Sequence, residues 1–155
     1  MSDLKTNLAK HFHQVYFGGN WAASSFVETI KDISYEDATK TIDEMNSIAV
    51  LSFHIHYYVR SVMMYLEGNE FKSSDKDSFL IETIKSESDW EDFKLSIVTE
   101  GERFSFLLDK QNDLDQLFIK EDYGSKYRNF HGIIEHTHYH LGQIVLLKKL
   151  LVKRN

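Results

Sequence analysis

Residues 129–152 read NFHGIIEHTHYHLGQIVLLKKLLV, and this segment predicts a long amphipathic helix. Ile133, Ile144 and Leu147 recur at steps of three and four, which places them on one face of a helix. His136 and His140 fall on the same face. An apolar face that carries polar groups in its middle is typical of a site built inside a helix bundle. This helix therefore carries both a packing surface and a candidate site.

Other segments of the chain repeat the helical pattern. A first helix is expected over about 3–17, with a continuation over about 21–31 after Gly18-Gly19-Asn20. A second is expected over about 47–66 with Asn46 as its N-cap, and a third after a capping box of Ser88 and Glu91. The third helix should bury a stripe that includes Gly101, which would allow a close approach of a neighbouring backbone; the stripe comprises Trp90, Phe93, Ile97, Gly101, Phe104 and Leu108.

The composition agrees with a helical fold. The 155 residues include no proline, which turns of β-rich domains commonly use. Strand-like runs such as residues 53–59 are ambiguous by periodicity alone, and their length favours helix. We therefore expect an all-α protein, an antiparallel four-helix bundle with short extra helices, formed by residues 1–155 as a single domain.

Several classes of function are disfavoured. A net charge of −6 argues against a nucleic-acid partner. The absence of cysteine excludes disulfides, thiolate ligands and a cysteine nucleophile. No apolar run reaches membrane-spanning length and the first residues lack a secretion signal, so no membrane partner and a cytoplasmic location are expected. Phosphate-binding glycine motifs are absent, as is the HExxH pattern of metalloproteases.

Eight histidines raise the question of which could share a metal ion. Only His136 and His140 are four residues apart on one helix, where two imidazoles can converge on one ion. A third ligand should come from the helix over 47–66, which offers His54 and His56. His56 aligns with Ser52 and Arg60, which suggests a solvated row. His54 aligns with Val50 and Tyr58, so we predict the metal ligands His54, His136 and His140.

Other interpretations of these residues stay open at this stage. The histidine pair could be incidental, and Gln143 could either support a ligand or be an ordinary amide. Tyrosines could line a pocket or belong to the core, and Glu135 is expected on a solvated face. No catalytic residue or general base is assigned; the other side chains weighed are Tyr57, Tyr58, Tyr65, Tyr139, His11, His13, His131 and His138.

The same segments resemble the DinB-like superfamily of bacterial four-helix-bundle proteins, which includes bacillithiol-transferase-like members. The resemblance is carried by RNFHG at 128–132, EH at 135–136, YHLGQ at 139–143, FHIHYY at 53–58 and YFGGNW at 16–21. It implies a metal on one histidine of the second helix and two of the fourth, which match His54, His136 and His140. It also implies a homodimer and a divalent ion such as zinc or nickel.

The resemblance further implies a type of reaction. Characterised relatives include transferases and isomerases that use a small-molecule thiol, so an electrophilic substrate with a thiol cosubstrate is one expectation and hydrolysis is another. This sequence departs from the usual motif at Leu141, where relatives carry arginine. The function expected is a divalent-metal-dependent transferase or hydrolase. The alternative is a non-catalytic metal-binding or stress-associated helical module.

Overall fold

The computed structural model describes residues 3–154, with side chains described up to Leu151, and it is all-α over that range. This confirms the predicted fold class. No helix in the described range is both long and apolar enough to cross a membrane. The elements are α1 (Leu4–Phe17), α2 (Phe26–Ile30), α3 (Tyr35–Thr39), α4 (Ile48–Leu66), the 3₁₀ turn η1 (Asp77–Phe79), α5 (Glu87–Asp109), the 3₁₀ turn η2 (Glu121–Tyr123) and α6 (Lys126–Arg154).

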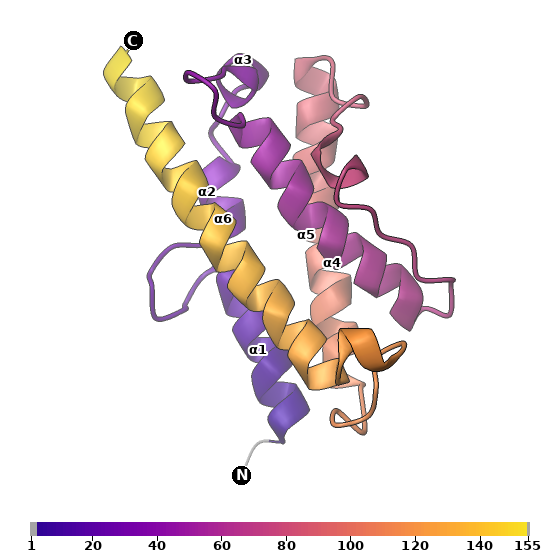
Figure 1. Cartoon of the computed structure of the whole chain (residues 1–155). Coiled ribbons are helices and arrows are strands. Elements are labelled where there is room, and N and C mark those ends of the chain that lie inside the picture. The colour runs from indigo at the N-terminus through magenta and orange to yellow at the C-terminus, as the bar shows by residue number, and fades with distance from the viewer. Residues whose placement is uncertain (1–2, 155) are drawn as a thin grey trace.

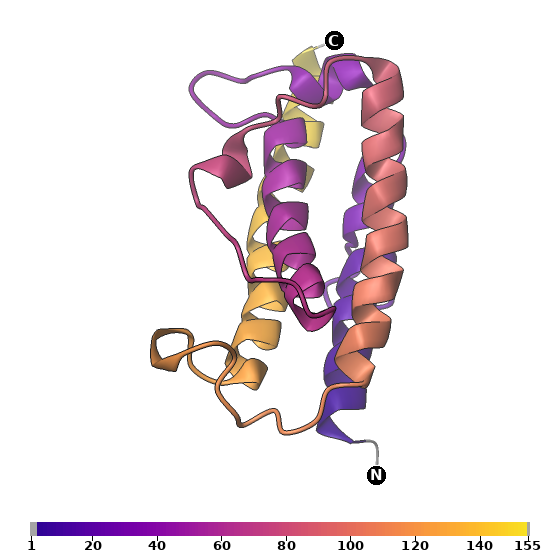
Figure 2. The same cartoon turned by 90° about the vertical axis from the view of Figure 1, so that its right-hand side faces the viewer.

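Four long helices, α1, α4, α5 and α6, lie alongside one another (Figures 1 and 2). Helix α1 packs mainly on α5, and α4 packs on α6. Following the chain in Figure 1, α1 and α6 run in one direction while α4 and α5 run in the other. The α4–α5 pair therefore departs from the expected antiparallel order. The connection over residues 67–86 has to return along the length of the bundle, and on its way it passes beside α4.

Serine side chains cap the starts of α4 and α5, but at positions other than those predicted. The α4 cap lies one residue later than predicted, and the α5 cap lies two residues earlier. The Ser47 hydroxyl accepts the Val50 amide at 3.3 Å, so Ser47 rather than Asn46 caps α4. The Ser86 hydroxyl accepts the Asp89 amide at 3.2 Å, so Ser86 rather than Ser88 caps α5. Each of these serines satisfies a backbone N–H that the first helical turn leaves without a partner.

The expected helix over residues 21–31 is shorter than predicted, because only 26–30 are helical. The Asn20 side chain explains the difference. Its amide donates to the carbonyls of Gln14 at 2.8 Å and Ser24 at 2.6 Å, and its oxygen accepts the Ala22 amide at 2.9 Å. These bonds hold a loop closed in place of a helical turn. Trp21 in that loop is fully exposed.

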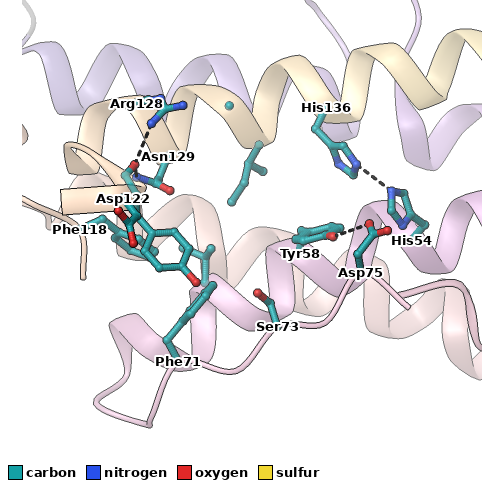
Figure 3. A pocket seen from close by; sticks show the side chains of 14 residues that line it. His54, Tyr58, Phe71, Ser73, Asp75, Phe118, Asp122, Arg128, Asn129 and His136 are labelled. Atoms are coloured by element: carbon teal, nitrogen blue, oxygen red, sulfur yellow. Dashed lines mark hydrogen bonds between the residues drawn. The ribbon is translucent and has the colours of Figure 1, made fainter. Parts of the chain in front are cut away.

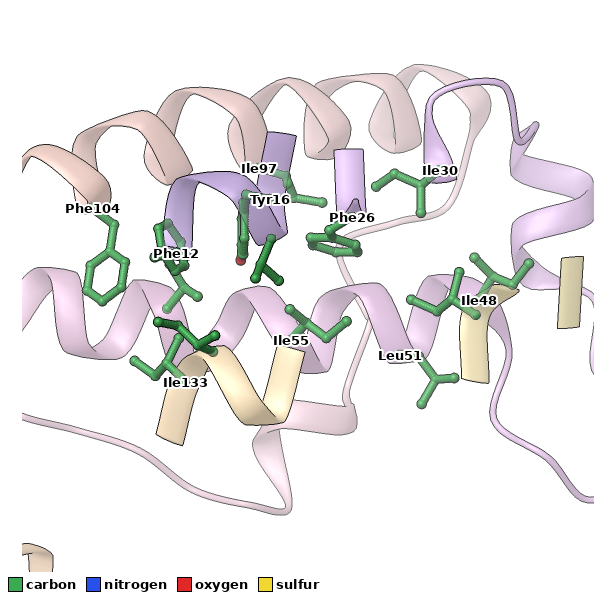
Figure 4. Packing of buried hydrophobic residues seen from close by; sticks show 14 of the residues in the cluster. Phe12, Tyr16, Phe26, Ile30, Ile48, Leu51, Ile55, Ile97, Phe104 and Ile133 are labelled. Carbon is green, nitrogen blue, oxygen red and sulfur yellow. The ribbon is translucent and has the colours of Figure 1, made fainter. Parts of the chain in front are cut away.

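The core lies between the long helices (Figure 4). Gly101 of α5 faces α1, and a Cβ there would lie 2.8 Å from Cδ1 of Tyr16. The predicted close approach is thus real, but an aromatic ring makes it and not a backbone. Large core side chains contribute about 1.5–3 kcal/mol each on burial; those shown include Phe12, Tyr16, Phe26, Ile30, Ile48, Leu51, Ile55, Ile97, Phe104 and Ile133.

Candidate metal centre

Three histidine rings from α4 and α6 meet at one point. The ring centroids of His54, His136 and His140 form a nearly equilateral triangle with sides of 4.8, 4.7 and 4.6 Å. One ring nitrogen of each lies within 4.8 Å of the other two. Among the residues that the structure describes, this is the only group of three histidine or acidic side chains placed to hold a metal ion. The predicted trio is therefore brought together.

The nitrogen spacing suits a small divalent ion. Nε2 of His54 and Nε2 of His136 are 2.9 Å apart. In a tetrahedral zinc site with bonds of about 2.0–2.1 Å, neighbouring ligand nitrogens are about 3.3 Å apart. The imidazoles of His54 and His136 need to separate by only a few tenths of an ångström to reach that spacing. Without one, the 2.9 Å contact is a hydrogen bond between the two rings.

Neighbouring groups fix which nitrogen of His54 carries the proton. The Ser78 hydroxyl donates to the Asp75 carbonyl at 2.5 Å, and Ser78 Oγ lies 2.8 Å from His54 Nδ1. A hydroxyl that has used its one proton can only accept a hydrogen bond, so His54 Nδ1 must be the donor. This leaves a lone pair on His54 Nε2, the atom that faces His136.

The same logic applies to His140. Its Nδ1 lies 2.7 Å from Oε1 of Gln143, one helical turn along α6. An amide oxygen accepts and never donates, so Nδ1 carries the proton and Nε2 carries the lone pair. Gln143 thus has the supporting contact that the sequence left open. Two of the three imidazoles are oriented as metal ligands before any ion binds.

Burial keeps His54 and His136 uncharged near neutral pH. Removal from water, followed by the neighbouring His140, lowers the pKa of His54 from 6.5 to about 4, although Asp75 opposes both effects. Burial followed by the neighbouring His140 and His54 also lowers the pKa of His136 to about 4. A metal ion binds the neutral imidazole, so neither His54 nor His136 has to lose a positive charge before the ion binds.

The connection between α4 and α5 covers one side of the triad. Phe79 stacks on the His54 ring with centroids 4.0 Å apart. Tyr58 presents its ring to both His54 and His136 and donates its hydroxyl proton to Asp75 Oδ1 at 3.1 Å. Figure 3 shows Tyr58 and Asp75 beside the two histidines. Sequence reasoning missed Asp75 and Ser78, because both lie in a polar segment without helical periodicity.

A pocket of about 490 Å³ opens beside the triad. His54, His136, Tyr58 and Asp75 lie at one end and Arg128 lies at the other (Figure 3). Its remaining walls are largely apolar and come from α4, α6 and the two connecting segments: Val62, Phe71, Ser73, Phe118, Asp122, Tyr123, Asn129, Gly132 and Ile133. A volume of this size fits a small organic molecule.

The expectation that His56 faces solvent is wrong. His56 is 2% exposed, and its Nε2 lies 2.9 Å from Oε2 of Glu100 on α5. Its Nδ1 lies 3.5 Å from the Tyr16 hydroxyl. Other long helices pack around α4, so a row containing Ser52 and Arg60 can still face a helix, and Ser52 is fully buried. His56 is a buried packing residue away from the triad.

The remaining candidates do not join the triad. Glu135 is exposed and pairs with His131 at 3.4 Å, as expected for a solvated face. His13 pairs with Glu102 at 3.1 Å, and His138 is half-buried with its ring 6.3 Å from that of His11. Of the four tyrosines that the sequence singled out, Tyr58 alone lines the pocket, whereas Tyr57 binds the Ser74 amide, Tyr65 binds the Phe118 carbonyl and Tyr139 is exposed.

Comparison with known proteins adds no family name to this geometry. No family model matches the chain, no curated protein matches it, and no solved structure matches it. The DinB-like resemblance therefore stays an expectation. Leu141, where the resemblance departs, is buried at 2% exposure, so that position faces the protein interior.

Proposed function

We propose that the protein binds a divalent metal ion through His54, His136 and His140 and is a metal-dependent enzyme acting on a small molecule. The observation that carries the proposal is the convergence of three imidazoles, two of which line the end of a pocket, with two of the lone pairs fixed by hydrogen bonds. Three protein ligands leave a coordination position free, as catalytic sites do and closed structural sites do not.

The ligand set indicates which ions fit and what they contribute. Imidazole suits zinc and nickel, and three neutral ligands leave the ion its full double charge. Such an ion supplies Lewis-acid chemistry, which polarises a carbonyl or lowers the pKa of a water or thiol. Since the chain has no cysteine, a thiol would be a cosubstrate. Hydrolysis and thiol transfer to an electrophile are the two reaction types that this chemistry serves.

Asp75 is the candidate proton acceptor in the pocket. Its carboxylate acts on the pKa of both His54 and His136, and Tyr58 holds it by a hydrogen bond of 3.1 Å. Asp75 is exposed, so its carboxylate can exchange protons with solvent between turnovers. If it accepts a proton in the reaction, Asp75→Asn should lower kcat about a hundredfold or more. Metal content of that variant should be unchanged.

The test of the proposal combines metal analysis with kinetics. Protein purified without chelators should hold about one equivalent of zinc or nickel, and His54→Ala and His140→Ala should lose it. Metal-loaded wild type should turn over ester substrates or a thiol with an electrophile, and His54→Ala should not. His11→Ala, an exposed histidine on α1, is the matched control. Equal metal content and equal rates in His54→Ala and wild type would reject the proposal.

Three further expectations belong to this proposal. Membership of the DinB-like superfamily, a homodimeric state and a cytoplasmic location rest on the sequence alone. The alternative of a non-catalytic metal-binding module predicts a coordination sphere without a pocket beside it. The open pocket that His54 and His136 line favours an enzyme over that alternative.

A further inference from the structure

The pocket extends from the triad along one side of α6. Arg128, Gly132 and His136 follow one another at intervals of four residues, and all three line it. Eight residues of α-helix span about 12 Å. A ligand that reaches from the metal ligands to Arg128 must therefore be elongated.

Gly132 is the residue that keeps this path clear. It lies in the middle of α6, where glycine costs about 1 kcal/mol relative to alanine. No positive φ requires it, and a Cβ built at Gly132 would meet nothing within 4 Å, so no neighbour packs against it. The remaining reason for a glycine at this position is that it leaves the neighbouring pocket volume open. A side chain at position 132 would project into the pocket between His136 and Arg128.

Arg128 supplies the positive charge at the far end. Its guanidinium contacts the Tyr123 carbonyl at 3.4 Å, and it forms no ion pair with any carboxylate in the described part of the chain. Asp122 also lines this end, but Lys120 pairs with it at 3.2 Å. A guanidinium without a carboxylate partner is suited to bind one from a ligand.

The walls between the two ends are aromatic. Phe71 packs edge-on against Phe118 and Tyr123, with centroids 5.6 Å apart in each case. These rings come from two connecting segments, and Gly132 and Ile133 of α6 line the same pocket. Such walls favour methylene or aromatic groups in the body of a ligand.

Resting on the proposed metal function, we propose that the substrate is an elongated carboxylic acid. Its reacting group lies at His54 and His136, its apolar body passes over Gly132, and its carboxylate pairs with Arg128. Position 132 then sets the length of ligand that the pocket accepts.

Two hydroxamic acids of equal length test this assignment on zinc-loaded protein. Octanedioic acid monohydroxamate carries a metal-binding group at one end and a carboxylate at the other, whereas octanohydroxamic acid ends in a methyl group. In calorimetry, the carboxylate probe should bind wild type about fivefold more tightly than octanohydroxamic acid does. A gain of this size is what a solvent-accessible ion pair contributes. Arg128→Gln should remove that difference, and Arg128→Lys should keep part of it.

Substitutions of glycine test whether the ligand passes beside position 132. Gly132→Leu should weaken both long probes at least about tenfold because the side chain fills the pocket. Gly142→Leu is the matched control, since Gly142 is exposed on the same helix and its Cβ also meets nothing. Both substitutions favour helix, so neither should unfold the protein.

A short probe, acetohydroxamic acid, separates the two proposals. If it binds while wild type treats the two long probes alike, or while Gly132→Leu leaves both long affinities unchanged, the carboxylate assignment is overturned and the metal function stands. If it fails to bind zinc-loaded protein, the open coordination position is absent, and both proposals fall together.

Discussion

Acidification of the metal-free protein from pH 7 to pH 5 should destabilise it through His54 and His136. In the folded state the pKa of each is about 4, against an ordinary value of 6.5. The unfolded chain therefore takes up protons first as the pH falls. The stability that these neutral imidazoles contribute is complete above pH 6.5 and is lost progressively toward pH 4.

The size of the loss follows from those two pKa values. Proton linkage between an unfolded pKa of 6.5 and a folded pKa of about 4 gives about 1.8 kcal/mol per histidine from pH 7 to pH 5. His136 is only half-buried, so water screens part of its contribution. We expect about 2–3 kcal/mol for the pair, a large share of the stability of an ordinary domain.

Urea unfolding in the presence of a chelator at pH 7, 6 and 5 measures this loss. Burial also lowers the pKa of His56 and His138, so wild type alone does not isolate the pair. The double variant His54→Gln/His136→Gln should lose about 2–3 kcal/mol less than wild type over this range. Equal pH dependence in wild type and the double variant would refute the reasoning.

Three further outcomes are expected. Ser78→Ala and Gln143→Ala should each lower metal affinity about 10–100-fold in competition with a chelating dye, since each removes the acceptor that orients a ligand; unchanged affinity would show that the rings are held by packing alone. Gly101→Ala should lower the unfolding free energy by about 1 kcal/mol. The clash of the new Cβ with Tyr16 costs about 1–3 kcal/mol, and the better helix propensity of alanine offsets about 1 kcal/mol of that cost. A higher midpoint in thermal unfolding would contradict this. Metal at a hundredfold excess over its Kd should stabilise wild type by about 2.7 kcal/mol in the same measurement, and a chelator should reverse the gain; an equal gain in His140→Ala would place the metal elsewhere.

The clustering of the three histidines could be predicted because it depends on local geometry. The spacing of His136 and His140 fixes their common face on any helix, and the apolar residues on that face show that it turns inward. The choice of His54 over His56 rested on the residues one turn away. That choice is consistent with the structure, but the reason given for rejecting His56 is wrong, since His56 is buried against Glu100. Periodicity cannot tell a row that faces water from one that faces another helix.

The rest of the site depends on long-range packing. Asp75 and Ser78 lie in a polar segment whose position is set only when α4 and α5 run in the same direction and the chain must return between them. Arg128 and Gly132 were visible in the sequence as part of a motif, but their pocket forms only when the 3₁₀ turn η2 and the segment around Phe71 close over α6. The local sequence pattern therefore does not predict that these connecting segments contact α4 and α6.

The returning connection has a consequence for how the centre moves. Residues 67–86 contain a single turn of 3₁₀ helix, yet they hold His54 in its metal-binding tautomer through Ser78. Segments with so few internal hydrogen bonds open locally at a far smaller free-energy cost than the helices beneath them. Amide hydrogens there should exchange with solvent long before those of α4 and α6, and an ion seated on the histidines should slow that exchange. The rate at which the centre gains or releases an ion would then follow the rate of local opening of residues 67–86, while the helix bundle stays folded.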